Sequence, residues 1–311
     1  MLRKNFAVLD IGSNSFHIII ANSPDGRRFE VIDREKAVHR LASKDGYGRS
    51  FIKEPDLRHA IKLIDLFKSK AAMNNAAIKA VATSAVREAV NRDEFVERVF
   101  AETGVKVDVI DGHEEANYIY SAARHFLHFK GSRILCVDIG GGSTEFITGS
   151  EEAPTFATSL RVGAVRFTRE FFPDFVVRKN SVTMAYYYAL GMIESIRAHV
   201  LKPGYEVAIF SAGTAKSVLM MATGMGLIPE GSQIFTYEDL VKVHDRVLDA
   251  KELKDRLDLP GLEPKRADVV VAGVIILKAI FEKLEVKQAL YSEYALREGV
   301  ILEQINKSDE R

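Results

Sequence analysis

The stretch Asp138-Ile139-Gly140-Gly141-Gly142-Ser143-Thr144-Glu145 decides how the rest of the chain is interpreted. An apolar run precedes it at 134–137 and another follows at 146–148. An apolar run, an acidic residue and three glycines together predict a buried strand, a tight turn and a returning strand. Glycine has no Cβ, so such a turn lets an anion approach backbone N–H groups, and the hydroxyls of Ser143 and Thr144 add donors. The stretch therefore predicts a phosphate-binding turn.

The same sequence pattern occurs a second time near the N-terminus. Residues 6–9 are apolar and lead into Asp10-Ile11-Gly12-Ser13-Asn14-Ser15, and a largely apolar run follows at 16–20. A single glycine turn is equally compatible with an ordinary hairpin, because short glycine motifs often occur by chance. Two copies in register, each Asp-Ile-Gly-x-x-Ser, favour a duplicated α/β lobe. We expect the two loops to face each other across a cleft and to bind one polyanion.

An acidic residue ends the predicted strand in both copies. A carboxylate cannot lie beside phosphate unaided, so Asp10 and Asp138 imply a cation between them and the substrate. Hard oxygen ligands of this kind suit Mg²⁺ or Mn²⁺. We therefore expect a divalent metal ion held by these two residues.

Arg87 follows a strand expected at 78–82 and lies in the first turn of the next helix. In open α/β sheets ligands bind at this edge, and a guanidinium there could clamp a phosphate with two N–H groups. A surface arginine paired with Glu88 or Asp93 explains the sequence equally well.

Two further junctions carry groups suited to phosphate chemistry. Ser211-Ala212-Gly213-Thr214 is another small-residue turn between a strand and a helix, which makes Gly213 and Thr214 candidate phosphate or nucleotide contacts. Asp111-Gly112-His113-Glu114-Glu115-Ala116 begins a helix. Acidic residues in a first turn usually serve the helix dipole or the cap, which we expect for one of the glutamates. The other could take a proton from a water above a bound phosphate.

The bulk composition indicates a soluble protein with no marked nucleic-acid or membrane partner. A chain of 311 residues is long enough for two domains, and 43 basic and 43 acidic residues give a net charge of zero. The single cysteine, Cys136, lies in a predicted buried strand, which excludes an internal disulfide and fits a reducing cytoplasm. No signal-peptide pattern or membrane-length apolar run is present. We expect a cytoplasmic protein that binds neither nucleic acid nor membrane, with its C-terminal third helical at 237–256 and 266–284.

The two Asp-Ile-Gly loops, the Ser211 turn and three further motifs resemble the exopolyphosphatase and guanosine pentaphosphate phosphohydrolase family. The further motifs are Ala82-Thr83-Ser84-Ala85-Val86-Arg87, Gly112-His113-Glu114-Glu115-Ala116 and Ala295-Leu296-Arg297-Glu298-Gly299. The resemblance extends from Phe6 to about Leu302. It implies two ribonuclease-H-like lobes of the actin, sugar kinase and Hsp70 ATPase superfamily, with an interlobe cleft. It also implies Mg²⁺-dependent removal of terminal phosphate from inorganic polyphosphate or pppGpp, and a homodimer.

The resemblance assigns roles to individual residues. Glu115 would be the general base, with a pKa raised by neighbouring carboxylates and a partly dry cleft, while Glu114 would interact with the helix N-terminus. Glu145 would organise the metal and the attacking water together with Asp138, and Arg87 would hold phosphate. The expected metal ligands are Asp10, Asp138 and Glu145. The expected substrate-binding residues are Ser13, Asn14, Ser15, Arg87, Gly140, Gly141, Gly142, Ser143, Thr144, Gly213 and Thr214.

We expect an N-terminal lobe at 1–122, completed by a terminal helix at 298–311, and a C-terminal lobe at 123–297. Two positions depart from the family pattern. Asn117 replaces a common arginine, and Tyr294 replaces a common glycine. An ATP-dependent kinase and an actin-like nucleotide-binding protein remain alternatives, because both use the same loops. The sequence does not rank polyphosphate against pppGpp, since each presents a terminal phosphoanhydride to the same groups.

Overall fold

The computed structural model describes residues 4–25, 28–44, 49–126, 131–150 and 153–309. The chain forms two compact units, one made of Met1–Ala122 with Leu296–Arg311 and the other of Ala123–Ala295. The C-terminal return to the first unit thus begins at Leu296. Within the described ranges, no helix is both long enough and apolar enough to cross a bilayer.

The first unit is built on a five-stranded sheet among its described residues, in the order β3-β2-β1-β6-β7. The strands β1, β2 and β3 are antiparallel neighbours, whereas β6 runs parallel to β1 and β7 parallel to β6. A separate hairpin pairs β4 with β5. The bounds are β1 (Lys4–Ile11), β2 (Ser15–Ser23), β3 (Glu30–Val38), β4 (Ala42–Lys44), β5 (Ser50–Ile52), β6 (Ala76–Ala82) and β7 (Val107–Val109).

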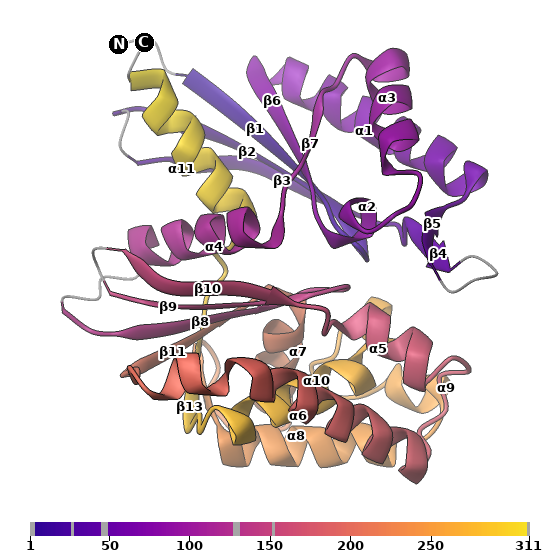
Figure 1. Cartoon of the computed structure of the whole chain (residues 1–311), viewed down its shortest axis with the longest axis vertical. Coiled ribbons are helices and arrows are strands. Elements are labelled where there is room, and N and C mark those ends of the chain that lie inside the picture. The colour runs from indigo at the N-terminus through magenta and orange to yellow at the C-terminus, as the bar shows by residue number, and fades with distance from the viewer. Residues whose placement is uncertain (1–3, 26–27, 45–48, 127–130, 151–152, 310–311) are drawn as a thin grey trace. The chain divides into compact units, whose positions relative to one another are not determined.

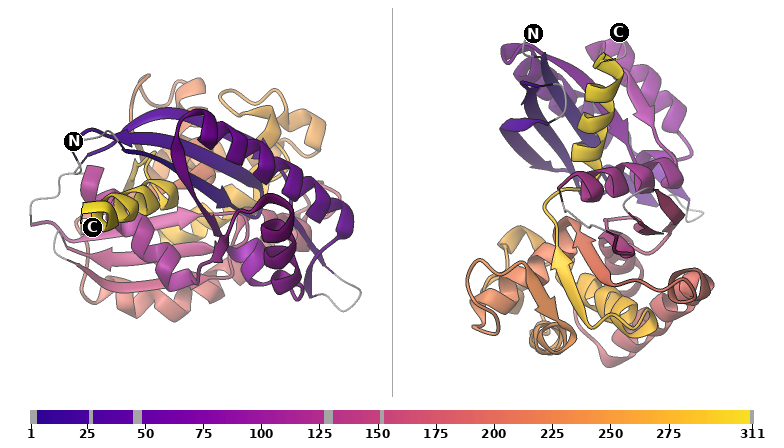
Figure 2. Two further views of the ribbon diagram at one scale, coloured as in Figure 1. Left: turned by 90° about the horizontal axis from the view of Figure 1, so that it is seen from above. Right: turned by 90° about the vertical axis from the view of Figure 1, so that its left-hand side faces the viewer.

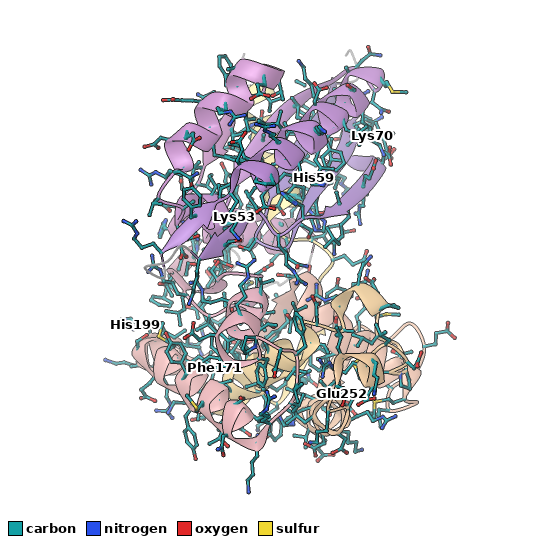
Figure 3. All side chains as sticks on the ribbon, turned by 90° about the vertical axis from the view of Figure 1, so that its right-hand side faces the viewer. Lys53, His59, Lys70, Phe171, His199 and Glu252 are labelled. Atoms are coloured by element: carbon teal, nitrogen blue, oxygen red, sulfur yellow. The ribbon has the colours of Figure 1, made fainter. Side chains whose placement is uncertain are left out.

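Helices cover both faces of this sheet. The helix α1 packs against α3 and the central strands, while α11 packs against β1 and β2 from the opposite face (Figures 1 and 2). Lys70, near the C-terminal end of α1 (Figure 3), forms ion pairs with Asp33 and Glu35 of the edge strand β3 at 2.9 and 2.5 Å. The bounds are α1 (Glu54–Met73), α2 (Ser84–Arg87), α3 (Arg92–Thr103), α4 (Gly112–Phe126) and α11 (Leu296–Asp309).

One glycine sets how closely two of these helices approach. A Cβ at Gly299 of α11 would lie 2.0 Å from the carbonyl oxygen of Tyr118 in α4. No side chain fits at that distance, so only glycine lets the two backbones cross there. This crossing fixes the N-terminal turn of α11.

The second unit has a six-stranded sheet in its described part, ordered β10-β9-β8-β11-β13-β12. Its strands are β8 (Ile134–Ile139), β9 (Thr144–Gly149), β10 (Pro154–Leu160), β11 (Val207–Ser211), β12 (Ile234–Thr236) and β13 (Gln288–Tyr291). Its helices are α5 (Ala164–Phe171), α6 (Lys179–Leu201), α7 (Ala212–Gly224), α8 (Tyr237–Asp249), α9 (Leu253–Arg256), the 3₁₀ turn η1 (Pro264–Arg266) and α10 (Val270–Lys283). The apolar α10 is buried and packs against α5, α6, α7 and α8.

The two sheets repeat one arrangement. In each, three antiparallel strands follow one another and a later strand runs parallel to the first of them, β6 beside β1 and β11 beside β8. The repeat confirms the duplicated α/β lobe that the paired loops predict and the two ribonuclease-H-like lobes that the family resemblance implies.

Local details differ from the expected helix boundaries. The helix expected at 237–256 is broken after Asp249, and Arg256 explains the break. Its fully buried guanidinium donates to the carbonyls of Ala267 at 2.8 Å, Ala250 at 2.9 Å and Phe175 at 2.6 Å. The Ala250 carbonyl directly follows α8, so the Arg256 guanidinium satisfies a backbone acceptor at the point where the chain leaves the helix.

Candidate active site

The glycine loop of the second unit is closed by a hydrogen bond from the Gly140 N–H to the Ser143 carbonyl, at 3.0 Å. The carbonyl of Gly140 accepts from the Ala164 N–H at 3.0 Å, and that of Gly141 accepts from the Val165 N–H at 2.9 Å. The loop carbonyls therefore point at the N-terminus of α5. In a trans peptide the carbonyl and the following N–H point in opposite directions. The N–H groups that follow these carbonyls consequently point away from α5.

Arg166 extends this arrangement by one peptide. Its Nε donates to the carbonyl of Gly142 at 2.7 Å, so the Ser143 N–H also points outward. A Cβ at Gly163 would lie 2.5 Å from the Gly141 oxygen, which shows how tightly the start of α5 packs under the loop. The outward N–H groups of Gly141, Gly142 and Ser143 form a concave donor set suited to an anion.

The N-terminal loop has the same backbone. The Gly12 N–H donates to the Ser15 carbonyl at 3.2 Å, as the Gly140 N–H donates to the Ser143 carbonyl. A Cβ at Gly12 would lie 3.1 Å from the Ser15 oxygen, against 3.2 Å at the equivalent position of the other loop. The sequence register of the two Asp-Ile-Gly-x-x-Ser copies is thus also a structural register.

Two contacts hold the polar tip of this loop. The Ser13 hydroxyl lies 2.8 Å from the Ser84 hydroxyl of α2. The Arg40 Nε donates to the Asn14 side-chain oxygen at 3.2 Å, and desolvation lowers the pKa of Arg40. Arg40 was not recognised from the sequence, because its contact crosses from the end of β3 to the loop.

Asp138 and Glu145 are direct cross-strand partners at the base of the second loop. Both are buried, with 8% and 1% of their surface exposed. The Asp138 carboxylate accepts from the Ser211 hydroxyl at 2.6 Å, and Glu145 accepts from the Ser159 hydroxyl at 2.7 Å. Side chains opposite each other in an antiparallel pair lie on one face of the sheet. Two buried neighbouring carboxylates with all-oxygen donors fit a Mg²⁺ or Mn²⁺ ion.

Asp10 holds the corresponding position in the first unit, where its direct cross-strand partner is His17. A Cβ at Gly12 would lie 3.8 Å from an oxygen of Asp10, so this carboxylate lies close to the loop. No three histidine, cysteine, aspartate or glutamate side chains gather into a metal-binding group in the portion of the chain that the structure describes. The described geometry thus supplies a carboxylate pair in the second unit and one carboxylate in the first.

The Ser211 turn is strained and carries an arginine that the sequence patterns did not reveal. Ala212 adopts a left-handed conformation with φ of 63°, an uncommon state for a residue with a Cβ. The guanidinium of Arg266 packs so closely on Gly213 that a Cβ there would lie 2.1 Å from Nη1. Burial lowers the pKa of Arg266, and its Nε has no hydrogen-bond partner in the described part of the chain. The buried hydroxyl of Thr214 is likewise without a partner there.

Arg87 and Glu115 form an ion pair. The Arg87 Nη1 donates to Glu115 at 2.9 Å and to the Ile110 carbonyl at 3.0 Å, and the two side chains are 19% and 10% exposed. Glu115, rather than Glu88 or Asp93, is therefore the acidic partner of Arg87.

Glu114 caps its helix, as the sequence predicts. Its carboxylate accepts from the Asp111 N–H at 2.9 Å, while Asp111 accepts from the Glu114 N–H at 2.8 Å. These reciprocal bonds form a capping box. They also lower the pKa of Asp111, with the bond from the Glu114 N–H as the largest cause. The two adjacent glutamates thus have different partners, and only Glu115 is paired with Arg87.

Comparison with known proteins agrees with this geometry. The chain matches the model of the Ppx/GppA phosphatase family over residues 19–308. It is 30% identical over 302 residues to exopolyphosphatase 1 of Mycobacterium leprae, covering 96% of this chain and 89% of that protein. It is 32% identical over 305 residues to the guanosine-5'-triphosphate,3'-diphosphate pyrophosphatase of Photobacterium profundum, covering 97% of this chain and 59% of that protein.

A solved structure supports the same assignment. The crystal structure of the Ppx/GppA family member of Aquifex aeolicus matches with a TM-score of 0.80 and 27% identity, covering 99% of both chains. The family match and this structural match both extend over nearly the whole sequence. The chain therefore belongs to the Ppx/GppA phosphatase family.

Proposed function

We propose that the protein is an exopolyphosphatase, which hydrolyses the terminal phosphoanhydride of inorganic polyphosphate by attack of water and releases inorganic phosphate. The observation that carries this proposal is the outward donor set of Gly141, Gly142 and Ser143, next to the buried pair Asp138 and Glu145. Backbone donors bind phosphate oxygens, and the hydrolytic activity named for the Mycobacterium leprae relative supports the reaction.

Both units contribute phosphate contacts in this proposal. In the second unit the hydroxyls of Ser143 and Thr144 add to the backbone donors, and in the first unit Ser13, Asn14 and Ser15 take the equivalent positions. Because phosphoryl transfer depends mainly on positioning and charge stabilisation, fixed donors of this kind supply much of the catalysis.

A divalent cation belongs to the same proposal. In the second unit Asp138 and Glu145 would hold a Mg²⁺ or Mn²⁺ ion, and in the first unit Asp10 is the proposed metal ligand. When bound, the ion would neutralise charge on the phosphate oxygens and polarise the terminal phosphoryl group. The Ser211 hydroxyl orients Asp138 and the Ser159 hydroxyl orients Glu145, so both carboxylates have fixed positions before any ion arrives.

Glu115 is the proposed general base. The Arg87 ion pair holds the Glu115 carboxylate in a defined position, from which it would accept a proton from the attacking water. The hydrogen bonds from Arg87 to the Ile110 carbonyl and to Glu115 both use Nη1. A guanidinium has five N–H donors in a planar fork, so Nε and Nη2 can bind a phosphate oxygen while the pair persists.

Hydrolysis of pppGpp to ppGpp is the second candidate function. The activity named for the Photobacterium profundum relative supports it, although this chain covers 59% of that protein. A kinase would need an acceptor, and an actin-like protein would couple hydrolysis to polymerisation.

The test is phosphate release from polyphosphate and from pppGpp, measured side by side with Mg²⁺, with Mn²⁺ and with excess chelator. Release from polyphosphate with no acceptor present supports the hydrolase, and faster turnover of pppGpp would replace the first candidate by the second. Release that requires an acceptor would support a kinase instead. A homodimer and a cytoplasmic location complete the proposal and rest on the family relationship.

A further inference from the structure

The imidazole of His17 lies between an arginine and a serine of the N-terminal loop. The Arg297 Nη1 is 2.6 Å from His17 Nδ1, and His17 Nε2 is 2.7 Å from the Ser15 hydroxyl oxygen. His17 is on β2, Arg297 is in the first turn of α11, and Ser15 begins β2 where the loop ends. All three residues belong to the first unit.

The hydrogen bonds from Arg297 to His17 and between His17 and Ser15 are compatible with one tautomer of the imidazole. Arginine nitrogens only donate, so Nδ1 of His17 must accept and carries no proton. The ring proton is therefore on Nε2, which donates to the Ser15 hydroxyl oxygen. With its oxygen already accepting from the ring, Ser15 can direct its own O–H toward another acceptor.

We propose that Arg297 and His17 are positioning residues, which fix Ser15 as a hydrogen-bond donor to a phosphate oxygen of the substrate. The inference rests on the proposed function, because it takes the anion to be a phosphate group of the polyanionic substrate. Ser15 corresponds to Ser143 in the duplicated loops, and only 7% of its surface is exposed. A hydroxyl whose oxygen is already held by the His17 ring loses little entropy when its O–H binds an anion.

The duplication explains why a histidine suits this position. His17 is the cross-strand partner of Asp10, as Glu145 is the partner of Asp138. A carboxylate can only accept, and Glu145 accepts from the Ser159 hydroxyl. An imidazole can accept on one nitrogen and donate on the other. The first unit therefore uses this position to direct a hydroxyl, whereas the second unit uses it for a carboxylate.

The packing of α11 brings the arginine to the ring. Gly299 allows α11 to cross α4 at backbone contact, and Leu296 is buried beside it. Arg297 lies between these two anchors and reaches β2 from a fixed helix turn. The Ala-Leu-Arg-Glu-Gly motif near the C-terminus thus supplies the arginine that orients the N-terminal loop through His17.

The first test determines the tautomer of His17 by ¹⁵N–¹H correlation of the imidazole in the wild-type protein. The inference expects the proton on Nε2, both without ligand and with inorganic tripolyphosphate. A proton on Nδ1, or an imidazolium near neutral pH, would overturn it. This measurement does not depend on catalysis.

The second test is a double-mutant cycle with tripolyphosphate binding measured by calorimetry. We expect Ser15→Ala to weaken binding by about tenfold, and Arg297→Met by about three- to tenfold, because each removes or disorders one hydrogen bond to a charged group. Since Arg297 acts through Ser15, the double variant should bind as weakly as Ser15→Ala alone. If the double variant loses affinity by the product of the two single losses, the inference is overturned.

Conservative variants separate positioning from folding. His17→Gln keeps one acceptor and one donor, so it should bind tripolyphosphate within about twofold of wild type, whereas His17→Leu should match the weakened Ser15→Ala variant. Arg34→Met removes an exposed arginine of β3 and serves as the matched control, with unchanged binding expected. Equal losses of tripolyphosphate binding in His17→Gln and His17→Leu would contradict the positioning of Ser15 by His17, even if Arg297→Met proves unstable.

Kinetics distinguish failure of the inference from failure of the proposed function. With polyphosphate as substrate, Ser15→Ala and Arg297→Met should lower kcat/KM by similar factors, as expected when both variants lose the same contact to the substrate. If the wild type hydrolyses neither substrate but the double-mutant cycle shows the expected coupling in binding, the proposed function is wrong and the positioning of Ser15 is supported. If hydrolysis occurs but the effects on binding are additive, the positioning of Ser15 is wrong and the proposed function is supported.

Discussion

Replacing Arg87 by lysine is expected to reduce activity although the positive charge is kept. One nitrogen of Arg87 binds both the Ile110 carbonyl, at 3.0 Å, and the Glu115 carboxylate, at 2.9 Å. A lysine ammonium is a point charge on a flexible stem and cannot hold both acceptors while offering a planar pair of donors to phosphate. The expected loss of activity therefore follows from the geometry of the hydrogen bonds rather than from a change of charge.

The structure sets the size of the effect. A hydrogen bond to a charged group contributes about 1.5–3 kcal/mol, and the partial exposure of the pair places this one near the lower limit. Arg87→Lys should then lower kcat/KM by roughly tenfold, since about 1.4 kcal/mol corresponds to a factor of ten. Arg87→Met also removes the charge and should cost roughly another tenfold.

The assay is release of inorganic phosphate from polyphosphate, carried out in the wild-type and Glu115→Gln backgrounds. Arg87→Lys should cost clearly less in the Glu115→Gln background, because the carboxylate that Arg87 holds is already gone. Wild-type kcat/KM in Arg87→Lys, or an equal loss in both backgrounds, would refute the reasoning.

Three further predictions concern the metal, the fold and the thiol. Asp138→Asn should reduce the divalent-metal dependence and the rate of phosphate release together, whereas full wild-type activity in excess chelator would contradict the metal assignment. Arg256→Met should lower the free energy of unfolding by about 3 kcal/mol in urea titrations, because it leaves buried carbonyls without donors. The exposed Lys254→Met is its control, and equal stability of the two variants would contradict the stabilising role of the hydrogen bonds from Arg256. Burial raises the pKa of the Cys136 thiol, so alkylation by iodoacetamide at mildly alkaline pH should require unfolding; rapid labelling of the native protein would contradict it.

Features set by short stretches of sequence were predictable. The two loops were placed in register from Asp-Ile-Gly-x-x-Ser, and the structure shows one backbone turn in both. Capping by one of the two glutamates in the first turn of α4 is predictable from their position, and the family resemblance assigns it to Glu114, whose partner groups are only a few residues away. Local patterns of this kind specify local hydrogen bonds, because donor and acceptor are fixed by the same turn.

Contacts between distant elements were not predictable in the same way. The partner of Arg87 is Glu115 because α2 and the start of α4 pack together, and no spacing in the sequence encodes that. Arg266 reaches Gly213 from the 3₁₀ turn before α10, and Arg40 reaches Asn14 from the end of β3. The break after Asp249 depends on carbonyls that a distant guanidinium satisfies. In each case tertiary packing supplies the partner.

The central claim is that Glu115 takes the proton from the attacking water while the loops and carboxylates hold the polyphosphate. The most direct measurement is the rate of phosphate release from polyphosphate by wild type, Glu115→Gln and the neighbouring control Glu114→Gln, with saturating Mg²⁺ and no acceptor. The account predicts release by the wild type, a fall in kcat of roughly 10²- to 10⁴-fold in Glu115→Gln with tripolyphosphate binding retained, and a small change in Glu114→Gln. A wild-type rate in Glu115→Gln, or a loss confined to Glu114→Gln, would contradict it.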